Sequence, residues 1–98
     1  MTHSENGATI QVRLTQMLAD HCGGEDTLTV QGRTVGEALR NLTARHPGLA
    51  RLVWTPAGEF NEQLVAFVQQ EDVRRLKGMN TPLGEDDELM LITAVEGG

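Results

Sequence analysis

The last two residues of this 98-residue chain, Gly97 and Gly98, have the clearest chemical potential in the sequence. Glycine lacks a Cβ, so a terminal Gly pair forms a thin arm of backbone that fits a narrow active site. The group that such an arm presents is the carboxylate of Gly98. A carboxylate becomes a useful acyl donor only when its oxygen joins a good leaving group, and phosphoryl chemistry with ATP commonly achieves this. The ending therefore predicts a flexible tail, residues 96–98, that is a substrate for a partner enzyme.

A terminal Gly pair is a short motif, and by itself it is weak evidence. At an average glycine content of about 7%, roughly 0.5% of chains end this way by chance. The glycine content here is higher, 11 residues in 98, so a chance Gly-Gly ending is somewhat more frequent. The alternative interpretation of the dipeptide is a frayed terminus without a function, and the elements that precede the pair have to decide between the two.

Other side chains with reactive potential are scattered along the chain. The three histidines, His3, His21 and His46, do not have the spacing of metal ligands, so we expect no metal site. Cys22 is the only cysteine, which excludes an intramolecular disulfide. No basic residue is predicted beside it, and we interpret it as a passive loop cysteine. Asp86-Asp87 is better explained as an acidic turn than as a catalytic pair.

The charge and composition exclude several classes of partner. Fourteen acidic residues against eight basic ones give a formal net charge of −6. This charge repels phosphate backbones, so nucleic acid is not expected as a partner, and it favours docking onto a basic cleft. Residues 1–7 lack the apolar core of a signal peptide, and no apolar run reaches membrane-spanning length. With the single cysteine, these features predict a soluble, cytoplasmic protein. Three basic residues form a small cluster that we interpret as a solvated edge: Arg74, Arg75 and Lys77.

The first part of the chain predicts two strands. Apolar and polar residues alternate from Thr9 to Leu14, which is typical of a half-buried strand. Residues 21–26 contain Gly23-Gly24 and two acidic side chains, and this composition indicates a turn. A second alternating segment follows over residues 27–31. The two strands are close enough in sequence to form a hairpin.

A helix is expected to follow this hairpin. Thr34 and Glu37 have the spacing of a capping box, in which each side chain binds a free backbone amide of the first turn. An apolar stripe at helical spacing continues from there. His46-Pro47-Gly48 ends the helix, because Pro47 disfavours helical angles at the residue before it. A short helical turn is predicted over residues 49–53.

The second part of the chain predicts three more strands. Leu64–Val68 is a continuous apolar run, as expected of a strand covered on both faces. Residues 70–72 form a polar turn, and Val73 begins a short return strand. An acidic turn over residues 84–87 precedes the last strand, Glu88–Val95, which runs directly into the Gly pair.

This order of elements predicts one α+β domain over residues 1–98, with a β-grasp fold. A mixed sheet of about four to five strands would surround one main helix, between a mobile lead, residues 1–8, and the tail. The outer strands would form hairpins. The first and last strands would lie side by side and parallel at the sheet centre, because a helical crossover links the two halves.

The second half of the chain resembles the ThiS/MoaD family of ubiquitin-like sulfur carriers. The resemblance extends from the strand at Thr9 onward, and its most specific part lies in three short segments: Thr81-Pro82-Leu83, Gly84-Glu85-Asp86-Asp87-Glu88 and Val95-Glu96-Gly97-Gly98. The segment Leu64–Arg74 is most similar to the branch that supplies sulfur for cysteine or related biosynthesis. Glu96 and Thr93 stand where relatives commonly carry Ala and Pro, and these departures concern the branch more than the carrier role.

The resemblance implies a cycle that partner enzymes carry out on Gly98. A ubiquitin-activating-type adenylyltransferase, similar to ThiF or MoeB, would adenylate the carboxylate with ATP, and a sulfur donor would convert the acyl adenylate to a thiocarboxylate. A biosynthetic enzyme for cysteine, thiamine or another sulfur-containing metabolite would then accept the sulfur. The chain itself would be a sulfur carrier and not an enzyme, would bind no cofactor, and would be a monomer when free. The residues do not identify the pathway.

Three alternatives use the same ending differently. As the small subunit of molybdopterin synthase, the chain would keep its tail inserted in a large catalytic partner, and stable co-purification would favour this function. A ubiquitin-like modifier would instead join Gly98 to lysines of target proteins. Lys77 is the only lysine here, so chains of the protein on itself would be restricted to one site. The third alternative is a β-grasp binding module with an incidental Gly-Gly end.

The last strand also predicts a docking surface. Met90 and Ile92 alternate with Leu89 and Leu91, so both faces of the strand are largely apolar. One helix covers only one face of a sheet fully. We therefore expect an exposed apolar patch with Met90 or Ile92, rimmed by charge, where the activating enzyme docks. Two further residues extend this predicted contact towards the tail: Val95 and Glu96.

Overall fold

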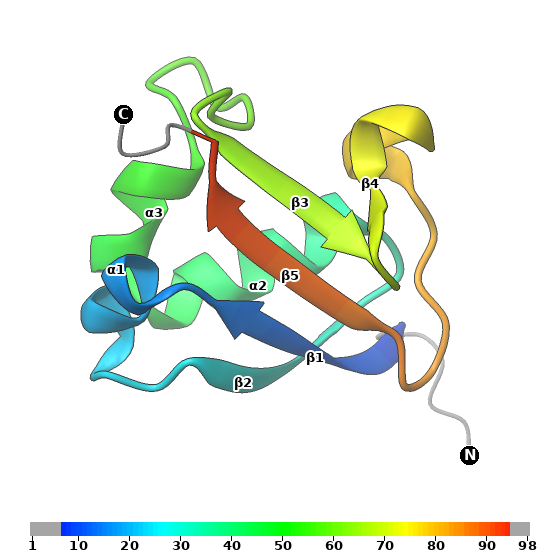
Figure 1. Cartoon of the computed structure of the whole chain (residues 1–98), viewed down its shortest axis with the longest axis horizontal. Coiled ribbons are helices and arrows are strands. Elements are labelled where there is room, and N and C mark those ends of the chain that lie inside the picture. Colours follow the sequence, from blue (N-terminus) through cyan, green and yellow to red (C-terminus); the bar gives the residue numbers. More distant parts are fainter. Residues whose placement is uncertain (1–6, 95–98) are drawn as a thin grey trace.

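The computed structural model describes residues 7–94, while residues 1–6 and 95–98 lie outside the described part (Figure 1). The elements follow in this order: β1 (Ala8–Leu14), α1 (Gln16–Ala19), η2 (Asp20–Cys22), β2 (Thr27–Gly32), α2 (Val35–Arg45), α3 (Pro47–Val53), β3 (Leu64–Val68), β4 (Glu71–Asp72), η3 (Val73–Arg75), η4 (Gly78–Asn80) and β5 (Glu88–Thr93), where η marks a 3₁₀ turn.

The strands form one mixed sheet in the order β2-β1-β5-β3-β4. β1 and β5 lie side by side at its centre and are parallel, with Val12 opposite Leu89, while the other neighbouring pairs are antiparallel. Figure 1 shows β5 between β1 and β3, with α2 crossing behind the sheet. The predicted β-grasp fold and its central parallel pair are confirmed.

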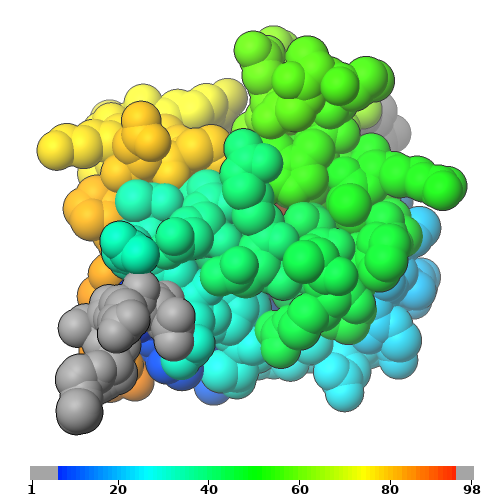
Figure 2. Space-filling view, turned by 180° about the vertical axis from the view of Figure 1, so that it is seen from behind, coloured from blue at the N-terminus to red at the C-terminus, as the bar shows by residue number. Residues whose placement is uncertain are grey.

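The core lies between the sheet and α2, with α3 at one end. Alternate residues of the strands point inwards because successive side chains of a strand face opposite sides. Figure 2 shows the covered face from behind, with α2 and α3 spread over the sheet. Ten large side chains are less than 2% exposed among the described residues: Ile10, Val12, Leu18, Val35, Leu39, Leu42, Leu49, Val53, Leu89 and Leu91.

The start of α2 confirms the predicted helix signal, with one difference. The Glu37 backbone N–H donates to Thr34 Oγ1 at 3.2 Å, as expected for a helix cap. The Glu37 carboxylate accepts from the backbone N–H of Arg33, at 2.6 Å, which is one residue before the cap. The helix is therefore anchored on both sides of Thr34.

Two helical segments differ from the prediction. The connection between β1 and β2 was predicted as a turn over residues 21–26, but helical structure begins at Gln16 and continues through η2. Residues 49–53 were predicted as a short turn, but α3 starts at Pro47 and is seven residues long. Pro47 ends α2 and also begins α3, because its fixed φ and missing N–H suit the first turn of a helix.

Three boundaries also move. The predicted return strand at Val73 was placed too late, because Gln69 and Gln70 both take positive φ, 51° and 72°, and turn the chain earlier into β4. Val73 instead begins η3 and is 2% exposed. β5 ends at Thr93 and not at Val95, which lies outside the described residues. β1 begins at Ala8, one residue earlier than the predicted strand start at Thr9.

No helix among the described residues is long and apolar enough to cross a membrane.

Candidate functional site

The chain is held by the sheet up to Ala94. β5 runs between β1 and β3, and the pairing with β3 continues one residue past the strand, where the Ala94 N–H donates to the Gln63 carbonyl at 2.7 Å. The predicted reactive residues Gly97 and Gly98, and the predicted contacts Val95 and Glu96, lie outside the described residues, so those roles stay predictions. The structure thus defines the root from which they continue.

Asn61 braces this root against α3. Its backbone N–H donates to the Val53 carbonyl at 2.8 Å, and its side-chain Nδ2 donates to the Leu52 carbonyl at 2.9 Å. Its Oδ1 accepts from the Gln63 N–H at 2.9 Å. Gln63, whose carbonyl binds Ala94, is therefore held by Asn61, and Asn61 is bound in turn to the end of α3. Sequence reasoning missed Asn61, although an Asn three residues before a strand is typical of an Asx turn, in which its side chain binds the N–H two residues on.

The outer face of the sheet carries an apolar patch at β3 and β5. Leu89 and Leu91 are fully buried towards α2, so Met90 and Ile92 face the other side, where both are partly exposed. Their partners on β3 lie directly opposite, Phe67 beside Met90 and Val65 beside Ile92. We call these four residues the outer patch: Val65, Phe67, Met90 and Ile92. The position of Met90 and Ile92 agrees with the predicted surface, while its binding role stays a prediction.

Polar residues border the outer patch on the side of β1. Arg13 lies opposite Met90 in the parallel pair, and its Nη1 contacts Glu88 Oε2 at 3.3 Å. A shallow hollow of about 310 Å³ extends over the patch towards Gln70 and Glu88. Because the outward positions of β1 and β2 are polar, the apolar contact area ends at β5.

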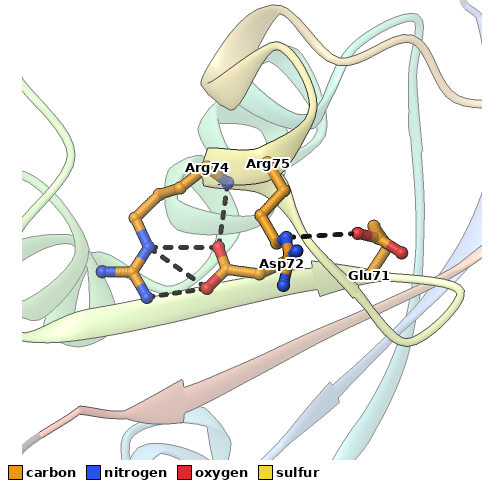
Figure 3. A network of polar contacts seen from close by, with 4 residues as sticks. All are labelled: Glu71, Asp72, Arg74 and Arg75. Carbon is orange, nitrogen blue, oxygen red and sulfur yellow. Dashed lines mark hydrogen bonds and ion pairs between the residues drawn. The ribbon is translucent and has the colours of Figure 1, made fainter.

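A network of four charged residues lies beside the patch at β4 (Figure 3). The Asp72 carboxylate accepts from the backbone N–H of Arg74 at 2.9 Å and binds its guanidinium, with the shortest contact at 2.7 Å. The side-chain hydrogen bonds from Arg74 hold the pKa of the Asp72 carboxyl below its usual value, and the same contacts raise the pKa of Arg74. Arg75 pairs with Glu71 at 3.8 Å. The predicted basic cluster is therefore partly neutralised by its neighbours.

Cys22 is buried and not in an open loop. It lies in η2 and is 3% exposed within the core. Burial raises the pKa of its thiol, and the carboxylate of Glu25 raises it further, so the reactive thiolate is disfavoured. The predicted loop position is wrong, while the passive role stays a prediction. Over residues 7–94, no group of three or more His, Cys, Asp or Glu side chains is arranged to hold a metal ion.

Comparisons with known proteins agree with this geometry. The sequence profile of the ThiS family matches residues 12–98. The sulfur carrier protein CysO of Mycobacterium tuberculosis (strain H37Rv) is 28% identical over 91 residues, which cover 91% of this chain and 98% of that protein.

Two solved structures show how closely the fold is shared. A CysO complex with BexX from Amycolatopsis orientalis matches with 28% identity and a TM-score of 0.82, over 91% of this chain and 99% of that one. The small archaeal modifier protein 1 of Methanosarcina acetivorans matches with 25% identity and the same TM-score, over 93% and 97% of the two chains. The similarity thus extends over nearly the whole of each protein.

Proposed function

This chain belongs to the ThiS family, and from this membership we propose that it is a sulfur carrier that works through the carboxylate of Gly98. The relatives named as sulfur carrier proteins match it over almost their whole length, which supports the same role for the whole chain. As a carrier, the protein is a co-substrate of partner enzymes and supplies no catalytic group of its own.

The cycle that we propose starts with activation of Gly98. An oxygen of its carboxylate attacks the α-phosphorus of ATP in the partner's active site, and pyrophosphate leaves. A donor with sulfur at the oxidation level of sulfide then attacks the acyl carbon, and AMP leaves with the original oxygen. With hydrosulfide as this donor, the product is a thiocarboxylate. Its sulfur displaces a leaving group from the substrate of a biosynthetic enzyme, and water then cleaves the acyl–sulfur bond, which leaves the sulfur on the product and returns the Gly98 carboxylate. ATP is a substrate of the activating enzyme, so the carrier needs no bound cofactor, and ATP supply favours the cytoplasm.

The root at Ala94 is the observation that carries the proposal. β5 is the central strand of the sheet, and its pairing with β3 holds the chain until Ala94. Four residues follow, and four extended residues span at most about 14 Å. A rigid body that ends in so short an arm presents Gly98 at a restricted distance, which suits a carrier whose end is used inside another protein.

The outer patch is our proposed docking face for the activating enzyme. Its apolar side chains lie on β3 and β5, the same strands that hold the arm, and polar residues border it at Arg13 and Glu88. An apolar centre with a polar rim is the usual arrangement of a protein interface. Val95 and Glu96 continue from β5 and remain part of this proposed contact.

A ubiquitin-like modifier is the second candidate function. The similarity to small archaeal modifier protein 1 supports it, because that protein is named a modifier and shares the fold over 97% of its length. The two functions share the activation of Gly98 and differ in the acceptor. A carrier passes sulfur on, whereas a modifier forms an amide bond with a lysine of its target.

Intact-mass spectrometry tests the proposal. The protein is incubated with its activating enzyme, ATP and a sulfide donor, and we expect a species heavier by the difference between sulfur and oxygen. A variant without Gly98 should keep the fold and remain unmodified. Failure to find either an adenylate or a thiocarboxylate on the full-length chain would refute the carrier function. Amide-linked conjugates without any thiocarboxylate would favour the modifier.

A further inference from the structure

Met17 is an exposed apolar side chain near the root of the arm. Among the described residues, two large apolar side chains are classed as exposed, Met17 at 53% and Leu76 at 44%. Single exposed apolar residues are common on protein surfaces and need no explanation by themselves. The surroundings of Met17 distinguish it, because it borders a hollow and Leu76 does not border the same one.

The hollow beside Met17 opens between α1, α3 and the ends of β3 and β5. We call it the Met17 pocket, and its volume is about 320 Å³. Most of its lining is apolar, and the remainder is formed by residues at the root of the arm. Its apolar lining comes from Met17, Leu18, Leu52 and Leu64, and its polar lining from Asn61, Gln63 and Thr93.

The Met17 pocket and the outer patch lie on opposite sides of β5. Thr93 lines the pocket and shares the inward side of the strand with Leu91, whereas Ile92 belongs to the outer patch. The last described contact with β3 comes one residue later, at the hydrogen bond between Ala94 and Gln63. The arm therefore starts between an apolar surface on the outer face and an apolar pocket on the inner side.

The length of the arm brings any enzyme that acts on Gly98 close to both surfaces. Residues 95–98 span at most about 14 Å when fully extended. The reacting atoms of the enzyme must lie within that distance of Ala94, so the mouth of its active site surrounds the root. The two glycines offer no side chains for recognition, and contacts that select this carrier must come largely from the body around Ala94.

We propose that the Met17 pocket receives an apolar side chain from the rim of the activating enzyme's active site. This inference rests on the proposed function. Together with the outer patch, the pocket lets the enzyme grip β5 from both sides just before the arm enters its site. The activating enzyme is the assigned occupant because every use of the Gly98 carboxylate has to pass through activation first.

Kinetics with single substitutions test the pocket. The assay is ATP–pyrophosphate exchange by the activating enzyme at varied concentrations of full-length carrier. Met17→Ala should raise KM for the carrier about fivefold, because about half of a methionine side chain remains to be buried. Met17→Glu should raise it further, since a carboxylate would have to leave water. Met17→Leu should restore nearly normal KM, and kcat should change little throughout.

Leu76 supplies the matched control. Leu76→Ala and Leu76→Glu change a similarly exposed apolar residue away from the root and should leave KM unchanged. Thermal unfolding of all variants should stay close to that of the unchanged protein, because about half of each side chain is already in solvent and neither belongs to the core.

The outcomes separate the two proposals. No exchange with the unchanged carrier would overturn the proposed function and, with it, the pocket's assignment. Normal exchange with equal KM for the unchanged carrier, Met17→Ala and Met17→Glu would overturn the pocket alone. Normal activation with a loss only in sulfur transfer to the accepting enzyme would also overturn it, because the pocket would then serve that later partner.

Discussion

Replacing Asn61 by alanine tests whether the root of the arm is braced as the structure indicates. The side chain makes two hydrogen bonds, from Nδ2 to the Leu52 carbonyl and from the Gln63 N–H to Oδ1, both at 2.9 Å. Each bond contributes about 1 kcal/mol to the free energy of unfolding, so Asn61→Ala should lower it by about 2 kcal/mol. In a domain of this size, that corresponds to a fall of roughly 8–16 °C in Tm.

The functional consequence is separable from the loss of stability. The free energy of unfolding of a small domain is about 5–15 kcal/mol, so a variant that loses about 2 kcal/mol of it remains folded at 25 °C. Without the Asn61 side chain, Gln63 is held less firmly. Ala94, whose N–H donates to the Gln63 carbonyl, is then also held less firmly. We therefore expect a rise of a few-fold in KM for activation of Gly98, measured at 25 °C where the fraction of unfolded protein is negligible.

Asn80 is the matched control for this experiment. It is an exposed asparagine of η4 for which no side-chain hydrogen bond is seen in the described structure. Asn80→Ala should change the free energy of unfolding by less than about 0.5 kcal/mol and should leave KM unchanged. Equal urea midpoints for Asn61→Ala and Asn80→Ala would refute the brace. A large loss of stability with an unchanged KM would limit its role to folding.

Three further predictions concern the outer patch, Asp72 and Cys22. Ile92→Glu should raise KM in the reaction with the activating enzyme at least tenfold, because it places a charge within an apolar contact. Thr29→Glu, on the polar half of the same face, should leave KM unchanged. Similar KM values for the two variants would argue against docking at the outer patch. The folded-state pKa of Asp72 lies below its unfolded value, so its contribution to stability is present above about pH 4 and is lost as the pH falls through the folded pKa. Urea midpoints of the unchanged protein and Asp72→Asn should therefore differ at pH 7 and converge in acid, and a constant difference would contradict this linkage. Cys22 should react slowly with a thiol reagent until the protein unfolds, and Cys22→Ala should leave activation unchanged; a loss of thiocarboxylate formation in a folded variant would reveal an active thiol.

The main elements were predictable because each has a strong local pattern that agrees with its burial. The alternation over Thr9–Leu14 corresponds to β1, whose inward residues Ile10 and Val12 are buried against α2. The cap at Thr34 marks the start of α2. These patterns report which side of an element faces the core, and that information largely determines a β-grasp fold.

The misplaced segments have local patterns that do not reveal their conformation. α1 is four residues long, which is too short for a helical period to appear in the sequence. The turn after β3 uses Gln69 and Gln70 at positive φ, where glycine or asparagine is the usual signal. The residues of α1 favour a helix but are too few to show a pattern, whereas at Gln69 and Gln70 the surrounding structure imposes a conformation that the residue type disfavours.

Only the β5 residues of the outer patch were predictable from the sequence. Met90 and Ile92 were identified from alternation, because a strand under a single helix has one face left over. The partners Val65 and Phe67 depend on the register of β3 with β5, which alternation does not specify. The brace at Asn61 and the Met17 pocket depend on contacts between α3, α1 and the strand ends, and these are known only once the chain is folded.

The position of β5 at the centre of the sheet has a consequence for biosynthesis. β5 joins β1 to β3, yet it comes after all the other strands in sequence, at residues 88–93, so the sheet closes only once this segment has been made. A nascent or truncated chain that stops before Glu88 lacks the strand on which both halves of the sheet depend, so its apolar residues stay exposed to proteases and chaperones. We therefore expect chains truncated before Glu88 to be degraded rather than to compete for the activating enzyme.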